Sequence, residues 1–239
     1  MHRNNMRERP YTILSTASIP LESFPGIPAS IDVRMIPFIE ILPRPGEELI
    51  QEIEAIAREK KTVIFTSAHA VRAVGKWAGQ NPDWQIYCVG RETATAIQKT
   101  FGESLNIQIA ANAQSLSELI VNAGIKQAVF FCGDQRLDTI PVNLRNANIQ
   151  LDQLVVYETR LTPVRLDFQP DVILFFSPTA VRSFFSMNPL QPGVKLFAMG
   201  TTTEATLKQF TENPVTISPQ ADKNYVLKMA IEHAGLHPI

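Results

Sequence analysis

Short apolar runs alternate with amphipathic stretches along most of the chain. The runs are rich in Val, Ile, Leu and Phe, which is typical of buried strands. Between them, apolar residues recur with helical spacing, as at Leu49, Ile53 and Ile56 or at Val71 and Val74. This alternation predicts parallel sheets covered by helices, so the expected class is α/β. The expected strands are 11–14, 62–65, 85–89, 107–110, 128–131, 154–157, 172–176, 195–199 and 215–217.

The chain contains an internal repeat. Residues 64–74 (IFTSAHAVRAV) resemble residues 174–184 (LFFSPTAVRSF), and Phe, Ser, Ala, Val and Arg recur at the same places. Residues 86–93 (IYCVGRET) align with residues 196–203 (LFAMGTTT) at the same offset. Because several blocks keep one register, the repeat indicates two similar α/β domains.

The two copies are unequal in length. The first copy continues through a further strand, a helix and another strand, whereas the second has no such continuation. A strand–linker–strand unit at residues 11–41 has no counterpart, so we predict that it completes the second copy. One domain, 42–156, is then inserted into another that is built from 1–41 and 157–239. The chain must cross twice between them, which predicts a two-stranded β hinge with a cleft between the domains.

Charge and composition narrow the classes of function. The sequence has 22 Lys and Arg against 23 Asp and Glu, for a net charge of −1, which disfavours nucleic acid as a partner. No apolar run approaches the ~20 residues of a membrane span, and no apolar segment follows the charged N-terminus. We therefore expect a cytoplasmic protein with no membrane contact. No long heptad run supports coiled-coil assembly, and we expect a monomer.

The two cysteines are not candidates for a disulfide framework or a metal site. Cys88 and Cys132 are too few for a disulfide framework or a cysteine-based zinc cluster. Each lies in an apolar run, so both are expected to be buried thiols. We expect neither a metal nor a cofactor.

Candidate binding residues follow the expected strands. Ligands of parallel α/β sheets bind beyond the carboxyl ends of the strands, where helix N-termini favour anions. The same residue types are also typical of ordinary helix caps and tight turns, and the sequence leaves both interpretations open. The candidates, all at such junctions, are Ser67, Gly90, Thr93, Gly133, Ser177, Gly200, Thr202 and Thr203.

Two further side chains are of interest. Tyr157 is expected to end a strand that crosses between the domains, where its phenol either donates a proton or packs the hinge. His69 lies in the first turn after Ser67, and we expect it to be a surface residue rather than a base.

These blocks together resemble the uroporphyrinogen-III synthase family. The matching segments are FTSAHAV at 65–71, VGRETA at 89–94, FCGDQR at 131–136, VVYET at 155–159, FFSPTAV at 175–181 and AMGTTT at 198–203. The resemblance implies two flavodoxin-like domains joined by a two-stranded β-ladder. One segment departs from the family pattern of an Arg-Pro pair and a helix after the first strand. Here Pro20, Pro25 and Pro28 make a regular helix improbable.

The resemblance also implies a reaction. The substrate would be hydroxymethylbilane, a linear tetrapyrrole with eight carboxylates, and the product uroporphyrinogen III. Water is lost, ring D is inverted through a spiro intermediate, and the macrocycle closes without a cofactor. By residue matching, Tyr157 would assist the loss of the hydroxyl, and the eight junction residues would bind substrate. The alternative is a non-catalytic two-domain module that binds a tetrapyrrole.

Overall fold

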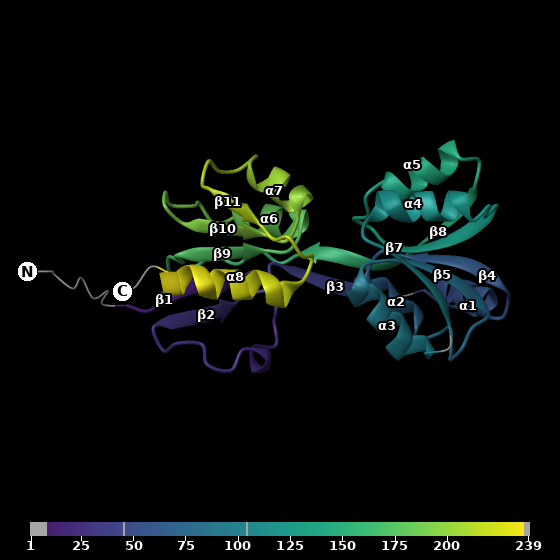
Figure 1. Cartoon of the computed structure of the whole chain (residues 1–239), viewed down its shortest axis with the longest axis horizontal. Coiled ribbons are helices and arrows are strands. Elements are labelled where there is room, and N and C mark those ends of the chain that lie inside the picture. Colours follow the sequence, from purple (N-terminus) through teal and green to yellow (C-terminus); the bar gives the residue numbers. More distant parts are fainter. Residues whose placement is uncertain (1–8, 45, 104, 237–239) are drawn as a thin grey trace, which may run out of the picture. The chain divides into compact units, whose positions relative to one another are not determined.

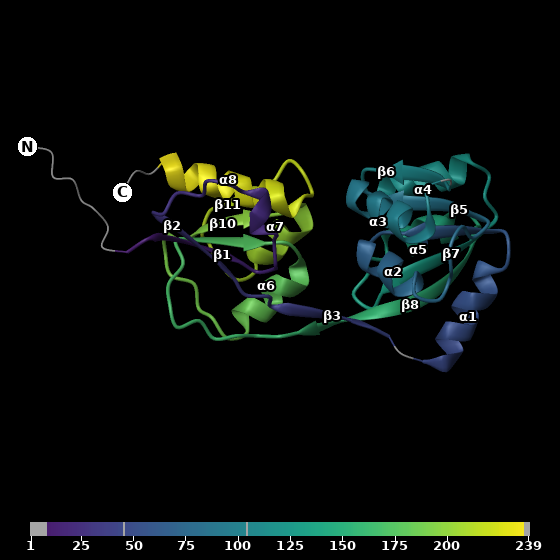
Figure 2. The ribbon, with the colours of Figure 1, turned by 90° about the horizontal axis from the view of Figure 1, so that it is seen from below.

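The computed structural model describes residues 9–44, 46–103 and 105–236. The chain folds as two compact units. Ile41–Thr159 forms one, which we call the inserted unit, and the chain before and after it, up to Glu40 and from Arg160, forms the split unit. In each unit, helices cover both faces of a central sheet (Figures 1 and 2). Both units are therefore three-layered α/β folds.

The inserted unit is built on a six-stranded sheet in the order β3-β8-β7-β4-β5-β6. From β8 to β6, each strand pairs in parallel with its neighbour. Central parallel strands are buried on both faces, which explains their nearly continuous apolar runs. The strands are β3 (Ile39–Pro43), β4 (Lys61–Phe65), β5 (Trp84–Val89), β6 (Asn106–Ala110), β7 (Gln127–Gly133) and β8 (Gln150–Leu161).

Helices cover the two faces of this sheet with separate apolar clusters. Phe65 and Phe131 lie in the cluster with α1, α2 and α3, and the preceding residues Ile64 and Phe130 lie in the cluster with α4 and α5. This division follows from the alternation of side chains along a strand. The helices are α1 (Glu47–Ala57), α2 (Ala68–Val74), α3 (Arg91–Phe101), α4 (Ala113–Asn122) and α5 (Thr139–Asn146).

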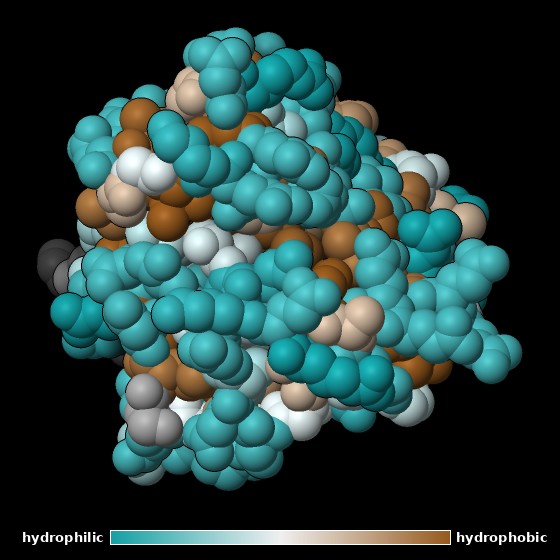
Figure 3. Space-filling model, turned by 90° about the vertical axis from the view of Figure 1, so that its right-hand side faces the viewer, coloured by the Kyte–Doolittle hydropathy of each residue, from teal (hydrophilic) through white to brown (hydrophobic). Residues whose placement is uncertain are grey.

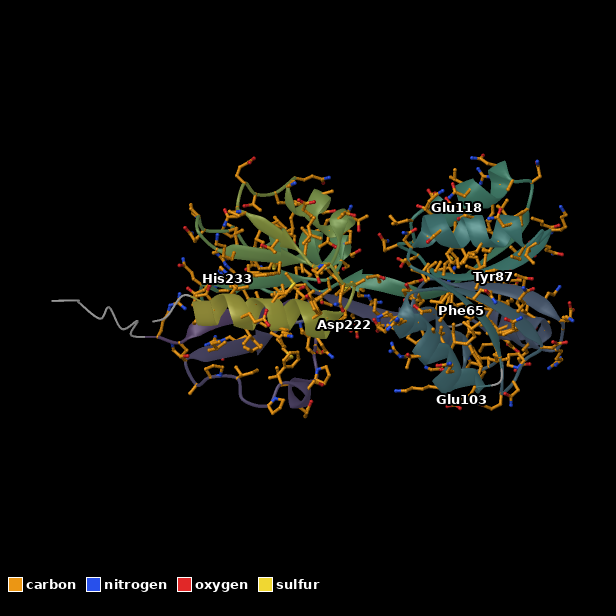
Figure 4. The ribbon with its side chains drawn as sticks, in the orientation of Figure 1. Phe65, Tyr87, Glu103, Glu118, Asp222 and His233 are labelled. Atoms are coloured by element: carbon orange, nitrogen blue, oxygen red, sulfur yellow. The ribbon has the colours of Figure 1, made fainter. Side chains whose placement is uncertain are left out.

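The face of the inserted unit that Figure 3 shows is mostly polar. Phe65 and Tyr87 lie on its central sheet, whereas Glu103 and Glu118 lie on its periphery (Figure 4). Hydrophilic side chains cover most of the face in Figure 3, and the apolar ones form small groups between them. Such scattered apolar exposure is ordinary for a protein surface.

The split unit has a five-stranded parallel sheet in the order β11-β10-β9-β1-β2. Apolar residues of α6 and α7 form a cluster with one face, and those of α8 with the other. The elements are β1 (Tyr11–Ser15), β2 (Ile31–Met35), β9 (Val172–Phe175), α6 (Pro178–Phe185), β10 (Lys195–Ala198), α7 (Thr201–Leu207), β11 (Val215–Ile217) and α8 (Lys223–Leu236).

The segment between β1 and β2 holds only a short 3-10 turn, η1 (Leu21–Ser23). The prolines of this segment predict the lack of a regular helix, because proline lacks an N–H and clashes with the preceding turn. Ile19 and Phe24 instead pack into the apolar cluster that contains α8.

The division between the units differs from the expected one by one residue at the first crossing and by three at the second. Tyr157 does not end its strand, because β8 continues to Leu161. It also belongs to the inserted unit rather than to the other, since it lies opposite Gly133 on β7. The pairing with β7 ends at Tyr157, and the rest of β8 continues beside its other neighbour, β3.

Candidate active site

The candidate residues of the inserted unit lie at one edge of its sheet. β8, β7, β4 and β5 are neighbours and parallel, so their carboxyl ends lie side by side. Tyr157 is on β8 and Gly133 ends β7, while Ser67 and Gly90 follow β4 and β5. The structure therefore brings together four of the predicted residues, from segments far apart in the sequence.

Tyr157 packs directly on Gly133. A Cβ atom added to Gly133 would lie 2.5 Å from Tyr157 Cε2 and 2.7 Å from its hydroxyl oxygen, closer than real Cβ atoms approach. The register of the two strands shifts between Cys132 and Gly133, which is typical of a β-bulge that re-aims a side chain. Glycine is thus required here for space, and it fixes the position of the phenol.

Ser67 contacts both the start of α2 and Tyr157. Its hydroxyl caps α2 by accepting a hydrogen bond from the backbone N–H of His69 at 3.1 Å. The Ser67 side chain is also hydrogen-bonded to Tyr157. One serine therefore serves as the helix cap predicted from the sequence and as a partner of the candidate catalytic phenol.

The surroundings of Tyr157 act on its acidity in opposite directions. Burial raises the pKa of Tyr157 above its ordinary value, and the hydrogen bond from Ser67 acts to lower it. Cys132 and Asp134 raise it further by charge repulsion. The phenol therefore keeps its proton at neutral pH, as a proton donor must.

His69 has a contact that its expected place at the surface did not suggest. The side chain is half-buried, and its ring centroid lies 5.9 Å from that of Tyr157 with an interplanar angle of 55°. Sequence reasoning missed this contact because the two residues lie on different strand–helix segments. The only signal was the place of His69 in the first turn after Ser67.

The junction after β5 exposes its backbone together with the side chains of Arg91 and Glu92. Gly90 has φ 78°, a conformation that favours glycine, and no atom lies within 4 Å of a Cβ added there. It precedes α3, whose first N–H groups have no partner within the helix. Thr93 is only 5% exposed. The hydroxyl of Thr93 is therefore not available to a ligand, and at this position only the main-chain amide is.

The split unit repeats the pattern at the ends of β9 and β10. Ser177 caps α6 by accepting a hydrogen bond from Ala180 N–H at 3.2 Å. Gly200 precedes α7, and a Cβ added to it meets no atom within 4 Å. Thr202 is exposed, whereas Thr203 is only 3% exposed. The hydroxyls of Thr201 and Thr202 and the backbone of this turn are thus available to a ligand.

Thr16 lies at the end of β1 and was not among the residues predicted for the site. Thr16 is buried, and its hydroxyl donates to the carbonyl of Leu174 at 2.7 Å. Its backbone N–H donates to the same carbonyl. Thr16 therefore ties the end of β1 to Leu174 on β9, three residues before Ser177, and has no spare donor for a ligand.

The described residues form neither a metal cluster nor a helix that could span a membrane. Within residues 9–44, 46–103 and 105–236, no three His, Cys, Asp or Glu side chains gather as a metal site would require. No helix in that part of the chain is long and apolar enough to cross a membrane.

Comparison with known proteins names the family. The family model described as uroporphyrinogen-III synthase HemD matches residues 29–227, which is most of the chain. The chain belongs to the uroporphyrinogen-III synthase family. The family's enzymes are cofactor-free cyclising lyases of tetrapyrrole biosynthesis, and the chain is a member of that class.

Solved structures of the family share its fold. The uroporphyrinogen-III synthetase from Helicobacter pylori is 17% identical, with a TM-score of 0.65 over 94% of this chain and 99% of that one. A mutant uroporphyrinogen III synthase from Thermus thermophilus is 16% identical, with a TM-score of 0.62 over 94% and 98%. Curated protein sequences give no significant match. At these identities the likeness supports the two-domain α/β fold.

Proposed function

We propose that this chain converts hydroxymethylbilane to uroporphyrinogen III and that Tyr157 donates the proton in the first step. The observation that carries the proposal is the placement of Tyr157 against Gly133 and Ser67, at the carboxyl edge of the sheet. A phenol at this edge lies where parallel α/β sheets bind their ligands. Membership of the synthase family supplies the reaction.

The two strand-end edges bind the substrate carboxylates. In the inserted unit the donors are Ser67 and the backbone at Gly90 and Gly133, and in the split unit they are Ser177 and the backbone at Gly200. Helix N-termini favour anions through unpaired N–H groups, so no excess of basic residues is needed. This agrees with a net charge of −1 for a protein whose ligand carries eight negative charges.

The threonines contribute in different ways. The exposed hydroxyl of Thr202 contacts the ligand directly, whereas the buried Thr93 and Thr203 contribute through the amides of their helical turns. Their side chains also fill the space beneath each turn and fix its backbone. The cleft between the two units stays a prediction.

In the first step the phenol of Tyr157 transfers its proton to the hydroxymethyl oxygen. The carbon–oxygen bond breaks, water leaves, and the electron pair of the pyrrole nitrogen forms the cationic azafulvene. The phenolate recovers a proton when the closed macrocycle loses one from ring D. Because the azafulvene reacts readily, the protein mainly has to orient the chain so that ring D inverts through the spiro intermediate.

We expect the chain to act as a monomer in the cytoplasm, with a small-molecule substrate and with no nucleic acid or membrane partner. The balance of 22 basic and 23 acidic residues supports the absence of a nucleic-acid surface. Size-exclusion chromatography with light scattering tests the oligomeric state.

The test is the isomer of the product. Freshly made hydroxymethylbilane is incubated with the chain, the products are oxidised, and the isomers are separated by chromatography. The proposal predicts type III above the spontaneous background of type I. Type I alone, together with tight ligand binding, would instead indicate a non-catalytic tetrapyrrole-binding module.

A further inference from the structure

His69 lies beside Tyr157, the candidate proton donor, but has no role in the reaction outlined above. Its ring is tilted by 55° against Tyr157 at a centroid distance of 5.9 Å, and its side chain is half-buried. Its backbone N–H is tied to the hydroxyl of Ser67, which in turn is hydrogen-bonded to Tyr157. The cap therefore fixes the start of α2 and with it the place of the imidazole next to the phenol.

The proposed reaction requires Tyr157 to carry a negative charge after it has given up its proton. A phenol that gives up its proton becomes an anion, and burial together with the charge of Asp134 opposes that anion. The hydrogen bond from Ser67 favours it. A positive charge close to the ring would favour it further, since an opposite charge within about 4–6 Å stabilises an ionised group.

We propose that protonated His69 is a positioning residue that makes Tyr157 a stronger proton donor to the departing hydroxyl of the substrate. The inference rests on the proposed function and adds a pH-dependent group to the same site. Histidine suits the task because it is the side chain that changes its charge between about pH 5 and 8.

Some groups around His69 and Tyr157 favour a positive charge on His69, and others disfavour it. The first turn of α2 disfavours a cation, because a helix N-terminus is itself positive. Asp134, which interacts with Tyr157 from the end of β7, favours it, as do the carboxylates of a bound substrate. We therefore expect the positive charge to matter most in the enzyme–substrate complex.

The experiment measures kcat between pH 5.5 and 8.5 for the full chain and for three variants. The wild type should lose activity as the pH rises and His69 becomes neutral. His69→Gln, which carries no charge, should be slower by roughly 3- to 10-fold at pH 6 and lose this dependence. His69→Lys carries a charge throughout the range and should keep the higher rate up to pH 8.5.

Thr179→Gln is the matched control. Thr179 occupies the place of His69 in the other copy of the repeat and should leave the pH profile unchanged. Combining His69→Gln with Tyr157→Phe tests the coupling, because the histidine has nothing to act on once the phenol is gone. The double variant should be no slower than Tyr157→Phe alone.

The outcomes separate this inference from the proposed function. If His69→Gln forms type III product with the wild-type pH profile, the role of His69 is overturned and the function stands. If the loss in His69→Gln adds in full to that in Tyr157→Phe, the histidine acts independently of the phenol, which also overturns the inference. If the wild type forms only type I product, both fail.

Discussion

Gly133→Ala tests the contact that fixes the candidate catalytic phenol. The added methyl group would lie 2.5 Å from Cε2 and 2.7 Å from the hydroxyl oxygen of Tyr157. The backbone of Gly133 does not have a positive φ, so alanine itself is not strained and only the space is lacking. Tyr157 must therefore leave its place, or the bulge between β7 and β8 must open.

The expected loss follows from overpacking a buried contact. Forcing an extra methyl group into a filled site costs about 1–3 kcal/mol. For a chain of this size, that lowers the melting temperature by roughly 2–10 °C. Because the phenol is displaced from Ser67, kcat should fall about as far as in Tyr157→Phe. Thermal unfolding followed by circular dichroism and a turnover assay measure the two effects.

Two controls show whether the tyrosine is the cause. Gly235→Ala adds a methyl group where no atom lies within 4 Å, on helix α8 of the other unit. It should leave kcat unchanged and cost no stability, because the methyl group meets no atom and alanine favours a helix. Gly133→Ala should also cost less stability in a Tyr157→Ala background. Wild-type stability and turnover in Gly133→Ala would refute the packing argument.

The remaining predictions concern caps, an ion pair and the thiols. Ser67→Ala and Ser177→Ala should each lose a helix cap and about 1 kcal/mol of unfolding free energy in urea titrations. Ser67→Ala also loses the bond to Tyr157 and should lower kcat, whereas Ser177→Ala loses a proposed substrate contact and should raise KM with kcat nearly unchanged. The carboxylate of Asp171 accepts two hydrogen bonds from the Arg9 guanidinium, at 2.8 and 2.9 Å, and one from the Thr12 N–H at 2.8 Å. Asp171→Ala removes this acceptor and should lower the free energy of unfolding by about 1–3 kcal/mol in the same assay. Burial raises the pKa of Cys88 and Cys132 to about 11. Unfolded thiols ionise at lower pH than the folded ones, so stability should fall as the pH rises from about 9 to 11, and iodoacetamide should label neither thiol at pH 8 unless the chain is unfolded.

Much of the fold could be predicted because buried parallel strands leave a simple pattern. The runs at 62–65 and 128–131 correspond to β4 and β7, and the internal repeat indicated that one α/β unit is inserted into another. The end of β8 could not be predicted, because the next three residues, Glu158, Thr159 and Arg160, are polar and the strand continues beside β3. The pattern of apolar residues indicates which positions are buried, but it does not indicate where the hydrogen bonding between two strands ends.

The site was predicted only in part for a similar reason. The junction residues such as Ser67 and Gly90 could be found, because strand ends and helix caps have a local signature. The need for Gly133 and the contact of His69 depend on the ring of Tyr157, which comes from a distant strand. Only the register of β7 against β8 brings these groups together, and a single sequence does not give that register.

The central claim is that Tyr157 supplies the proton that releases water from hydroxymethylbilane. Single-turnover rates of substrate consumption, for the wild type and for Tyr157→Phe at saturating protein, test it most directly. We predict a fall of roughly 10- to 100-fold in Tyr157→Phe with type III still the main product, since orientation of the substrate does not need the phenol. An unchanged rate in a folded Tyr157→Phe protein would contradict the claim.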